Sequence, residues 1–380
     1  MFKLNMIIFR VWEIALVSLI LWSVGQVNGL KADEPRIWWG KVIWQKLTIK
    51  RVALLPLTPV PRPPTIREEK RGLRPFVYGG PNMAIVKGQK IYVVDDMYFV
   101  DDRKSKNKRK LLECSMEGKI LREIDFPKDA PEYPVGCLTL CNDLLWIGLE
   151  APYAFAVDLK SWRVVEERRW KGKGIVADMF AMPDRTLYVV MPAKIFRGEC
   201  YAIWQIIKVQ PNGKQESQIE DGLRPAYVTA DGIIYWVNEH HPRTPFAHRF
   251  LAIFCGRFGE TPKEVTKITI QQLLKDAYID WPASGNHIIG VIKGNLLIIA
   301  SLMGKADKYG RTWMSDIFLQ IDQSGGFKVI GEEPYFARPI RSLELPYWWV
   351  CEGEVYGIMR EDVGEHSRFW LVKLDIKGLR

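Results

Sequence analysis

The sequence lacks the short motifs that identify many enzymes from one contiguous stretch of chain. None of its 380 residues forms a nucleophile elbow, a P-loop, a Rossmann fingerprint or an HExxH zinc motif. Their absence argues against the enzyme classes that carry their chemistry on a single local segment. It leaves open a site assembled from distant parts of the chain.

Cysteine is also scarce, with six residues and no pair at a metal-binding spacing. Cys137 and Cys141 lie four positions apart in a predicted strand. At about 3.3 Å per residue they are roughly 13 Å apart, which is beyond disulfide reach. The others are scattered: Cys114, Cys200, Cys255 and Cys351. We expect buried free thiols, with one or two disulfide bridges as the alternative.

The chain has no tail of one charge sign, although its net charge is +10. Acidic residues are interspersed with the basic ones almost everywhere. This pattern favours a solvated surface with a basic bias. The alternative is attraction to an anionic partner such as an acidic glycan, a phosphate or a lipid headgroup.

The longest N-terminal apolar run, Ile14 to Val24, is short for a bilayer span of about 20 residues. Lys3 and Arg10 precede it, and Val27-Asn28-Gly29 offers a cleavage site after Gly29. We predict that residues 1–29 are a signal peptide or, if uncleaved, an N-terminal anchor, the only predicted membrane contact. The protein is then secreted, periplasmic or at the cell surface, where nucleic acid is a poor partner. No cysteine follows closely, which argues against a lipoprotein anchor.

A pattern of strand, polar loop, strand and tight turn recurs six times along the chain. It is clearest at 90–94 with 111–118 and at 187–190 with 206–213, and further copies start at Leu144, Ile233, Leu296 and Val355. An additional strand precedes each copy: 82–86, 135–140, 176–181, 226–229, 287–292 and 346–350. A fourth strand follows five of them: 120–124, 164–168, 215–219, 265–268 and 327–330. Such units bury their apolar faces against neighbouring units.

The sixth unit ends before a fourth strand, and the segment Arg51–Leu57 is the obvious replacement. A ring of sheets closed in this way has no exposed edges. The chain here resembles the six-bladed β-propeller superfamily over about residues 40–380. It carries no diagnostic motif of the NHL, YWTD, TolB-like or gluconolactonase-like families. We therefore predict an all-β, six-bladed β-propeller closed by an N-terminal strand, with residues 30–380 as a single domain.

Two alternatives to this simple ring remain open at the level of sequence. A seven-bladed ring would use the N-terminal segment as part of its own blade. The apolar spacing within Thr269–Tyr278 also predicts a short amphipathic helix between the fourth and fifth units.

Five of the six connections between the second and third strands of a unit are long, and they share one face of a propeller. We predict loops at 95–110, 191–201, 238–249, 301–315 and 360–368. Long loops on a rigid scaffold commonly carry recognition. They mix cations, which pair with carboxylate or sulfate, with aromatic rings, which stack on sugars. The predicted ligand-binding residues are Arg103, Lys104, Lys108, Arg109, Tyr201, Arg243 and Trp313. A solvated charged surface is the alternative explanation.

A second candidate site lies on the propeller axis, where the first strands of the units converge. Asn82, Asp178, His287 and Glu344 lie near the beginnings of these strands. Their oxygen and nitrogen atoms suit a divalent cation such as Ca²⁺ or a catalytic metal. Resemblance to gluconolactonase-like propellers implies such an axial arrangement. Polar lining of a water-filled channel is the alternative.

Two further clusters are weaker candidates. Glu239-His240-His241 with His248 has zinc-binding residue types but no recognised spacing. The pairs at 95–96 and 101–102 suggest a Ca²⁺ loop without the EF-hand positions. We favour an exposed polar loop as the explanation of the first cluster, and local pairing with the basic run 103–110 as the explanation of the second.

From these features we expect an exported binding or scaffold protein rather than an enzyme. Its ligand would be anionic or carbohydrate-like, such as an acidic glycan or a cell-surface component, engaged through the long-loop face. The alternative is a metal-assisted hydrolase or lactonase at the channel mouth. A structural partner in a surface assembly is a third hypothesis.

Overall fold

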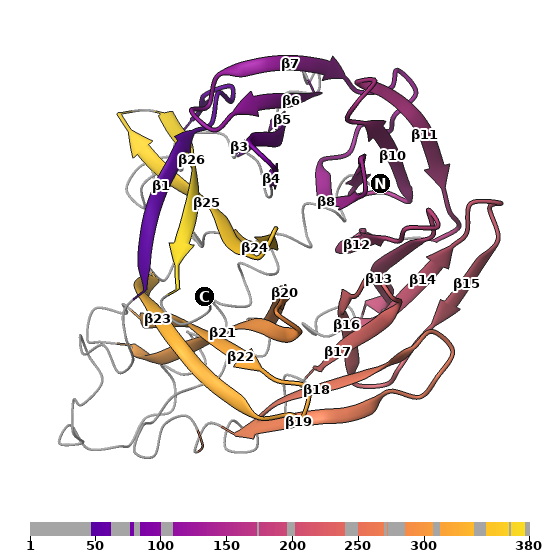
Figure 1. Cartoon of the computed structure of the whole chain (residues 1–380), viewed down its shortest axis with the longest axis vertical. Coiled ribbons are helices and arrows are strands. Elements are labelled where there is room, and N and C mark those ends of the chain that lie inside the picture. The colour runs from indigo at the N-terminus through magenta and orange to yellow at the C-terminus, as the bar shows by residue number, and fades with distance from the viewer. Residues whose placement is uncertain are drawn as a thin grey trace.

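The chain forms a ring of six four-stranded antiparallel blades in a computed structural model (Figure 1). The structure describes residues 47–61, 77–79, 84–99, 109–172, 175–195, 202–239, 250–269, 272, 286–306, 312–337, 347–364 and 366–376. Six separate sheets account for the repeat, so the prediction of an all-β, six-bladed β-propeller is confirmed and the seven-bladed alternative is wrong.

Within each blade the chain runs from the strand nearest the axis to the outermost strand. Two strands depart from this order: β1 supplies the outermost strand of blade 6, and the short β3 precedes the innermost strand of blade 1. Blade 1 is β4 (Ala84–Lys87), β5 (Lys90–Phe99), β6 (Arg109–Ser115) and β7 (Ile120–Asp125), with β3 (Val77–Gly79) paired to β5. Blade 2 is β8 (Val135–Cys141), β9 (Leu144–Leu149), β10 (Tyr153–Asp158) and β11 (Arg163–Arg169). Blade 3 is β12 (Asp178–Ala181), β13 (Leu187–Ile195), β14 (Ala202–Val209) and β15 (Gln215–Gln218). Blade 4 is β16 (Leu223–Val228), β17 (Ile233–Asn238), β18 (Phe250–Arg257) and β19 (Lys263–Thr269). Blade 5 is β20 (Asn286–Ile292), β21 (Asn295–Ala306), β22 (Thr312–Ile321) and β23 (Phe327–Ala337). Blade 6 is β24 (Tyr347–Cys351), β25 (Glu354–Val363), β26 (His366–Asp375) and β1 (Thr48–Leu54), with β2 (Val60–Pro61) also paired to β26.

Strand position within a blade explains the hydrophobic pattern of each strand. The middle strands β9 and β10 are buried along almost their whole length because a neighbouring blade covers each face. The outer strand β11 alternates instead, and Val165 on it is 52% exposed. This alternation follows from the two-residue period of a strand with one face toward solvent.

Each seam between neighbouring blades holds its own cluster of buried apolar side chains. Blades 5 and 6 meet through Phe318 and Trp348, whose ring centroids lie 5.8 Å apart in an edge-to-face contact. Blades 6 and 1 meet through a cluster that contains Leu371 and Val93. Every blade is therefore packed on both sides, which stabilises a ring in which no single sheet has a core of its own.

The strand β1 lies antiparallel to β26, with Ala53 opposite Leu371 and Leu54 opposite Trp370. The turn after β6 in blade 1 contacts this strand through Gly118, whose φ is +84°. A Cβ atom on Gly118 would lie 2.2 Å from the carbonyl oxygen of Leu54, closer than any side chain tolerates. A glycine is therefore required where blade 1 meets β1.

Blade 1 also contains a buried carboxylate on its third strand. The side chain of Glu113 is 1% exposed, and its oxygens accept hydrogen bonds from Lys90 Nζ at 2.8 Å and from Arg122. Burial alone raises the pKa of Glu113, but these two cations lower it below its ordinary value. This ion pair joins the second, third and fourth strands of the blade.

The connections between second and third strands differ from the sequence prediction. Residues 360–368, predicted as a loop, are mostly paired strand, with Glu361 opposite Arg368 and Val363 opposite His366. In blade 5 the strands continue to Ala306 and resume at Thr312. Polar residues in these segments favour a loop prediction. An antiparallel ladder, however, is formed by backbone N–H and C=O groups, so it can continue through polar residues. Several predicted loops are therefore strand extensions.

The remaining structural expectations concern cysteine and helix. Among the described residues the cysteines are free thiols: Cys114, Cys137, Cys141, Cys255 and Cys351. Gln272 is helical and exchanges capping hydrogen bonds with Thr269, while the rest of the predicted helix lies outside the described residues. In the part of the chain described here, no helix is long and apolar enough to cross a membrane.

Candidate functional site

The seam between blades 3 and 4 brings a charged cluster to the ring centre. Asp178 begins β12, Arg224 lies near the start of β16, and Glu239 directly follows β17. Each lies at the end of its strand toward the predicted long-loop face. Trp204 on β14 belongs to the same seam. We call Asp178, Trp204, Arg224 and Glu239 the channel-mouth cluster.

Strand alternation explains why Asp178 faces this seam. Its neighbours on β12, Met179 and Ala181, pack toward blade 2, whereas Phe180 packs toward blade 4. Asp178 shares the parity of Phe180, so its side chain is directed toward the seam with blade 4. Phe180 there contacts Tyr227 edge to face, with ring centroids 5.6 Å apart.

Asp178 is the most strongly perturbed carboxyl group of the cluster. Its side chain is partly buried, and this burial raises its pKa to about 6. A hydrogen bond donated by the backbone N–H of Met179 at 2.8 Å and the positive charge of Arg224 oppose the change without cancelling it. The group therefore changes charge near neutral pH.

Glu239 is perturbed in the same direction. Burial raises its pKa, while Arg224 and Trp204 partly offset the effect. The guanidinium carbon of Arg224 lies 4.6 Å from the centroid of the Trp204 ring, a cation–π distance. Two carboxyl groups with raised pKa values thus feel the positive charge of one guanidinium that is stacked on an indole. Grouped perturbed carboxyls are typical of functional sites.

The predicted metal residues are only partly placed. Asp178 is in the channel-mouth cluster, and His287 is opposite Ile299 in the backbone register of β20 and β21. Asn82 and Glu344 lie outside the described residues. Within the described ranges, no group of three or more His, Cys, Asp and Glu side chains is close enough to hold a metal ion.

The predicted ligand-binding residues are likewise only partly placed. Arg103, Lys104, Lys108, Tyr201 and Arg243 lie outside the described residues, and Trp313 stands opposite Phe336 in the register of β22 and β23.

Arg109 is fully described. It donates hydrogen bonds to the carbonyl oxygens of Pro131 at 2.9 Å and Tyr133 at 2.8 Å. Its guanidinium also lies 5.0 Å from the Phe126 ring centroid. These contacts hold the link between blades 1 and 2.

Sequence reasoning missed Arg224 and Trp204 and weighed Glu239 only as a zinc ligand. It placed the start of the fourth unit's first strand at Ala226, after Pro225. The structure starts β16 at Leu223, with a register irregularity between Pro225 and Tyr227. Proline is tolerated there because the innermost strand of a blade is an edge strand. Recognising that exception would have placed Arg224 in the strand.

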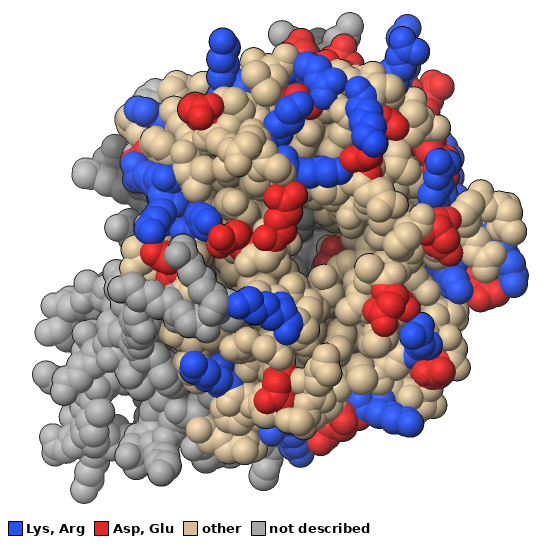
Figure 2. Space-filling view, in the orientation of Figure 1, with Lys and Arg blue, Asp and Glu red and all other residues tan. Residues whose placement is uncertain are grey.

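Figure 2 shows the ring centre as a hollow with acidic side chains around it, while acidic and basic groups alternate over the rest of the described surface in this view. The interspersed charges agree with a solvated surface.

No protein-family model and no curated protein sequence matches this chain. Among solved structures, it is similar to the β-propeller domain of Cps50 (Swd1) from Myceliophteria thermophila, with a TM-score of 0.40 and 8% identity over 78% of this chain and 98% of that one. It is also similar to a protein of unknown function from Bacteroides caccae, with a TM-score of 0.37 and 13% identity over 68% of this chain and 82% of that one. Likeness at this level says nothing about function, and the six-bladed architecture rests on the strand pairing of this chain.

Proposed function

We propose that this chain is an exported β-propeller that acts as a binding or scaffold protein for an anionic or carbohydrate-like ligand. The observation that carries the proposal is the channel-mouth cluster, in which Arg224 is stacked on Trp204 and its positive charge acts on both Asp178 and Glu239. A guanidinium supplies paired donors to a carboxylate or sulfate, and carboxyl groups accept from or donate to sugar hydroxyls. An acidic glycan or a cell-surface component combines these groups.

The predicted cations and aromatics of the same face would extend this contact. β5 with β6, and β21 with β22, carry their ladders outward toward the segments that hold Arg103, Lys104, Lys108 and Trp313. Tyr201 and Arg243 lie in the corresponding connections of blades 3 and 4.

Export and ring closure belong to the same proposal. Residues 1–29 would direct export and be removed or retained as an anchor, and the strand β1 that follows would seal the ring. Pairing of β1 with β26 supports the second part. N-terminal sequencing of the secreted protein tests the first part, because cleavage after Gly29 leaves Leu30 as the first residue.

Binding of the wild-type protein to acidic glycan arrays, and of the R224Q variant to the best glycan found, tests the ligand proposal. We expect R224Q to weaken binding by at least about tenfold, the value of one charge-assisted hydrogen-bond pair. R163Q is the matched control because Arg163 is exposed on the outer strand β11. The proposal fails if the wild-type protein binds no acidic glycan and Lys/Arg-to-Ser changes at 103–110 leave every phenotype intact.

One observation favours the alternative of a metal-assisted hydrolase or lactonase: the Asp178 carboxyl, with its pKa near 6, is suited to proton transfer. The neighbouring positive charge of Arg224 does not suit a divalent cation at this cluster. Elemental analysis of the purified protein separates the two functions. A stoichiometric divalent metal such as calcium would favour the enzyme, and its absence would count heavily against it.

A further inference from the structure

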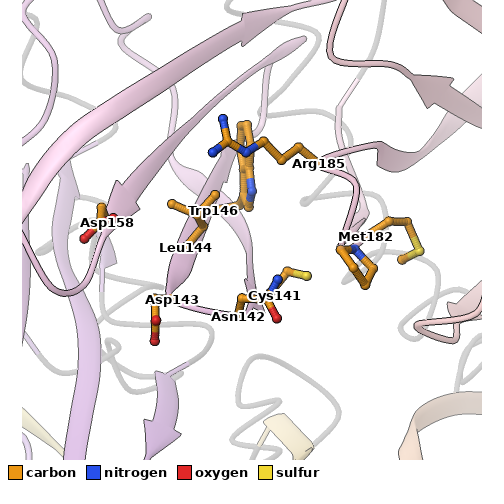
Figure 3. Close-up of a pocket in the computed structure, with 9 residues that line it drawn as sticks. Cys141, Asn142, Asp143, Leu144, Trp146, Asp158, Met182 and Arg185 are labelled. Carbon is orange, nitrogen blue, oxygen red and sulfur yellow. The ribbon is translucent and has the colours of Figure 1, made fainter.

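A cavity lies on the opposite face of the ring from the channel-mouth cluster. Its volume is about 280 Å³, and it sits where tight turns of blades 2 and 3 meet (Figure 3). These are the turn at 142–143 between β8 and β9, the end of β10 at Asp158, and the turn at 183–185 between β12 and β13. The cavity therefore spans a blade seam on the short-turn face. Its size is near the lower end for small-molecule sites, which begin at about 300 Å³.

Apolar side chains form the inner wall of this cavity. Trp146 is fully buried beneath it, Met182 is 7% exposed, and Leu144 lies beside them. The guanidinium of Arg168 covers the Trp146 ring at 5.0 Å from its centroid. This wall can receive a short hydrocarbon stem or a small ring.

The acidic groups around the cavity already have partners. The two oxygens of Asp143 pair with Lys87 Nζ and Lys160 Nζ, each at 2.5 Å, which lowers the pKa of Asp143 to about 2. Asp158 accepts hydrogen bonds from the backbone N–H groups of Lys160 and Ser161, both at 2.8 Å.

The neighbouring Asp184 accepts from the backbone N–H of Thr186 at 2.9 Å and from its hydroxyl at 3.0 Å. The carboxylates around the cavity thus already have partners within the protein. A cationic ligand is not needed to neutralise them.

Arg185 is different from these acids. In the described part of the chain its guanidinium has no hydrogen bond, ion pair or ring contact. In Figure 3 its side chain extends from the turn at 183–185 toward the residues of blade 2 that line the cavity. Its backbone is left-handed, with φ at 66°, a conformation that costs a side-chain-bearing residue about 1 kcal/mol or more. A glycine would adopt this backbone conformation more easily.

We infer that this cavity binds a small organic monocarboxylate, with Arg185 pairing with the carboxylate and the apolar side chains of Leu144 and Met182, backed by Trp146, receiving its stem. One guanidinium matches one carboxylate in a two-bond pair. Three carboxylates and three cations surround the site: Asp143, Asp158, Asp184, Lys87, Lys160 and Arg185. Because these charges balance, a dianion such as a phosphate ester would gain little attraction beyond the single arginine. A monoanion with an apolar part fits the site better.

The probe is 3-phenylpropionate, compared with its neutral amide, 3-phenylpropanamide, in titrations followed by calorimetry and ligand-observed NMR on the full chain. We expect saturable binding of the acid and at least about tenfold weaker binding of the amide, since only the acid forms a charge-assisted pair. R185Q should weaken binding of the acid to the level of the amide. R163Q, which changes an exposed arginine outside the cavity, should bind as the wild type does.

The R185G variant separates binding from folding. It should lose binding of the acid while its melting temperature stays equal to or above that of the wild-type protein, because glycine relieves the left-handed backbone. Equal affinity for acid and amide, undiminished binding by R185Q, or no binding by the wild-type protein would each overturn the inference. It does not depend on the channel-mouth cluster, so R224Q should bind 3-phenylpropionate normally.

Discussion

The charge state of Asp178 should control stability in a pH-dependent way, and the D178N variant exposes this effect. Asparagine has nearly the same shape, and its carbonyl oxygen can still accept the hydrogen bond from the Met179 N–H. It carries no charge at any pH. The variant therefore removes only the cost of placing a carboxylate in an environment that raises its pKa.

The magnitude follows from the two pKa values. The carboxyl has an ordinary value of 3.8 and a folded-state value of about 6. Since a tenfold change in proton affinity is worth about 1.4 kcal/mol, the full difference corresponds to about 3 kcal/mol. Because Asp178 is partly exposed, solvent reduces the penalty, and we expect about 1–3 kcal/mol.

The sign is set by which state binds the proton more tightly. Between pH 3.8 and about 6 the folded state holds the proton and the unfolded state does not, so this group makes folding less favourable as pH rises. D178N and wild type should match below this window. The variant should then become more stable through it, with a constant advantage above it.

Urea unfolding of both proteins across about pH 3.5 to 8 measures the difference directly. D129N is the matched control, because Asp129 is an exposed carboxylate that stays in water in both states. A D178N curve that runs parallel to wild type at all pH values would refute the reasoning. So would a variant that is less stable at neutral pH.

Three further predictions address the ring and its core. G118A should lower the free energy of unfolding in urea by about 2–4 kcal/mol, because its Cβ would collide with a backbone oxygen. The control G353A, at a glycine with open space around it, should lower it by only about 1 kcal/mol. Equal losses would contradict the close approach at Gly118. E113A should lower the free energy of unfolding by about 1–3 kcal/mol near neutral pH, because Lys90 and Arg122 lose their shared carboxylate. This loss should disappear once the pH falls through the lowered pKa of Glu113, since the wild-type carboxyl is then protonated as well. A loss of the same size in acid would contradict the ion pair. In the native protein a thiol reagent should modify Cys255 before the fully enclosed Cys137, whose pKa burial raises, and mass spectrometry that finds the reverse order would contradict the core assignment.

Much of the fold is accessible from the sequence because the repeat is local. Turns such as Lys87-Gly88-Gln89 and Lys293-Gly294-Asn295 mark where the first strand reverses into the second, and both glycines have positive φ in the structure. The predicted fourth strands 120–124 and 164–168 fall within β7 and β11. The errors lie where polar residues continue a ladder, as at 360–368. Periodicity of side chains cannot show pairing that depends only on the backbone.

The candidate sites were much less accessible. The sequence singles out Asp178 as a polar residue at the start of a first strand, without a partner. It does not identify Arg224, because Pro225 suggests that the strand begins after it, whereas β16 begins at Leu223. Nor does it reveal the Figure 3 cavity, because Arg185 occupies a turn that looks like any other polar hairpin. The pairing of Arg224 with Trp204 joins residues of two blades.

The sequence alone determined the repeated strand pattern and the propeller class, since each repeat encodes strands and turns within a few dozen residues and local periodicity is sufficient to read them. The strand pairing was needed to decide between six and seven blades. The tertiary structure decided which charged groups meet, because the seams bring together strands from separate repeats. It also decided their chemistry. The pKa of Asp178 depends on how completely neighbouring blades exclude water. The donors of Arg185 are available to a ligand because the nearby carboxylates already pair with other groups of the protein.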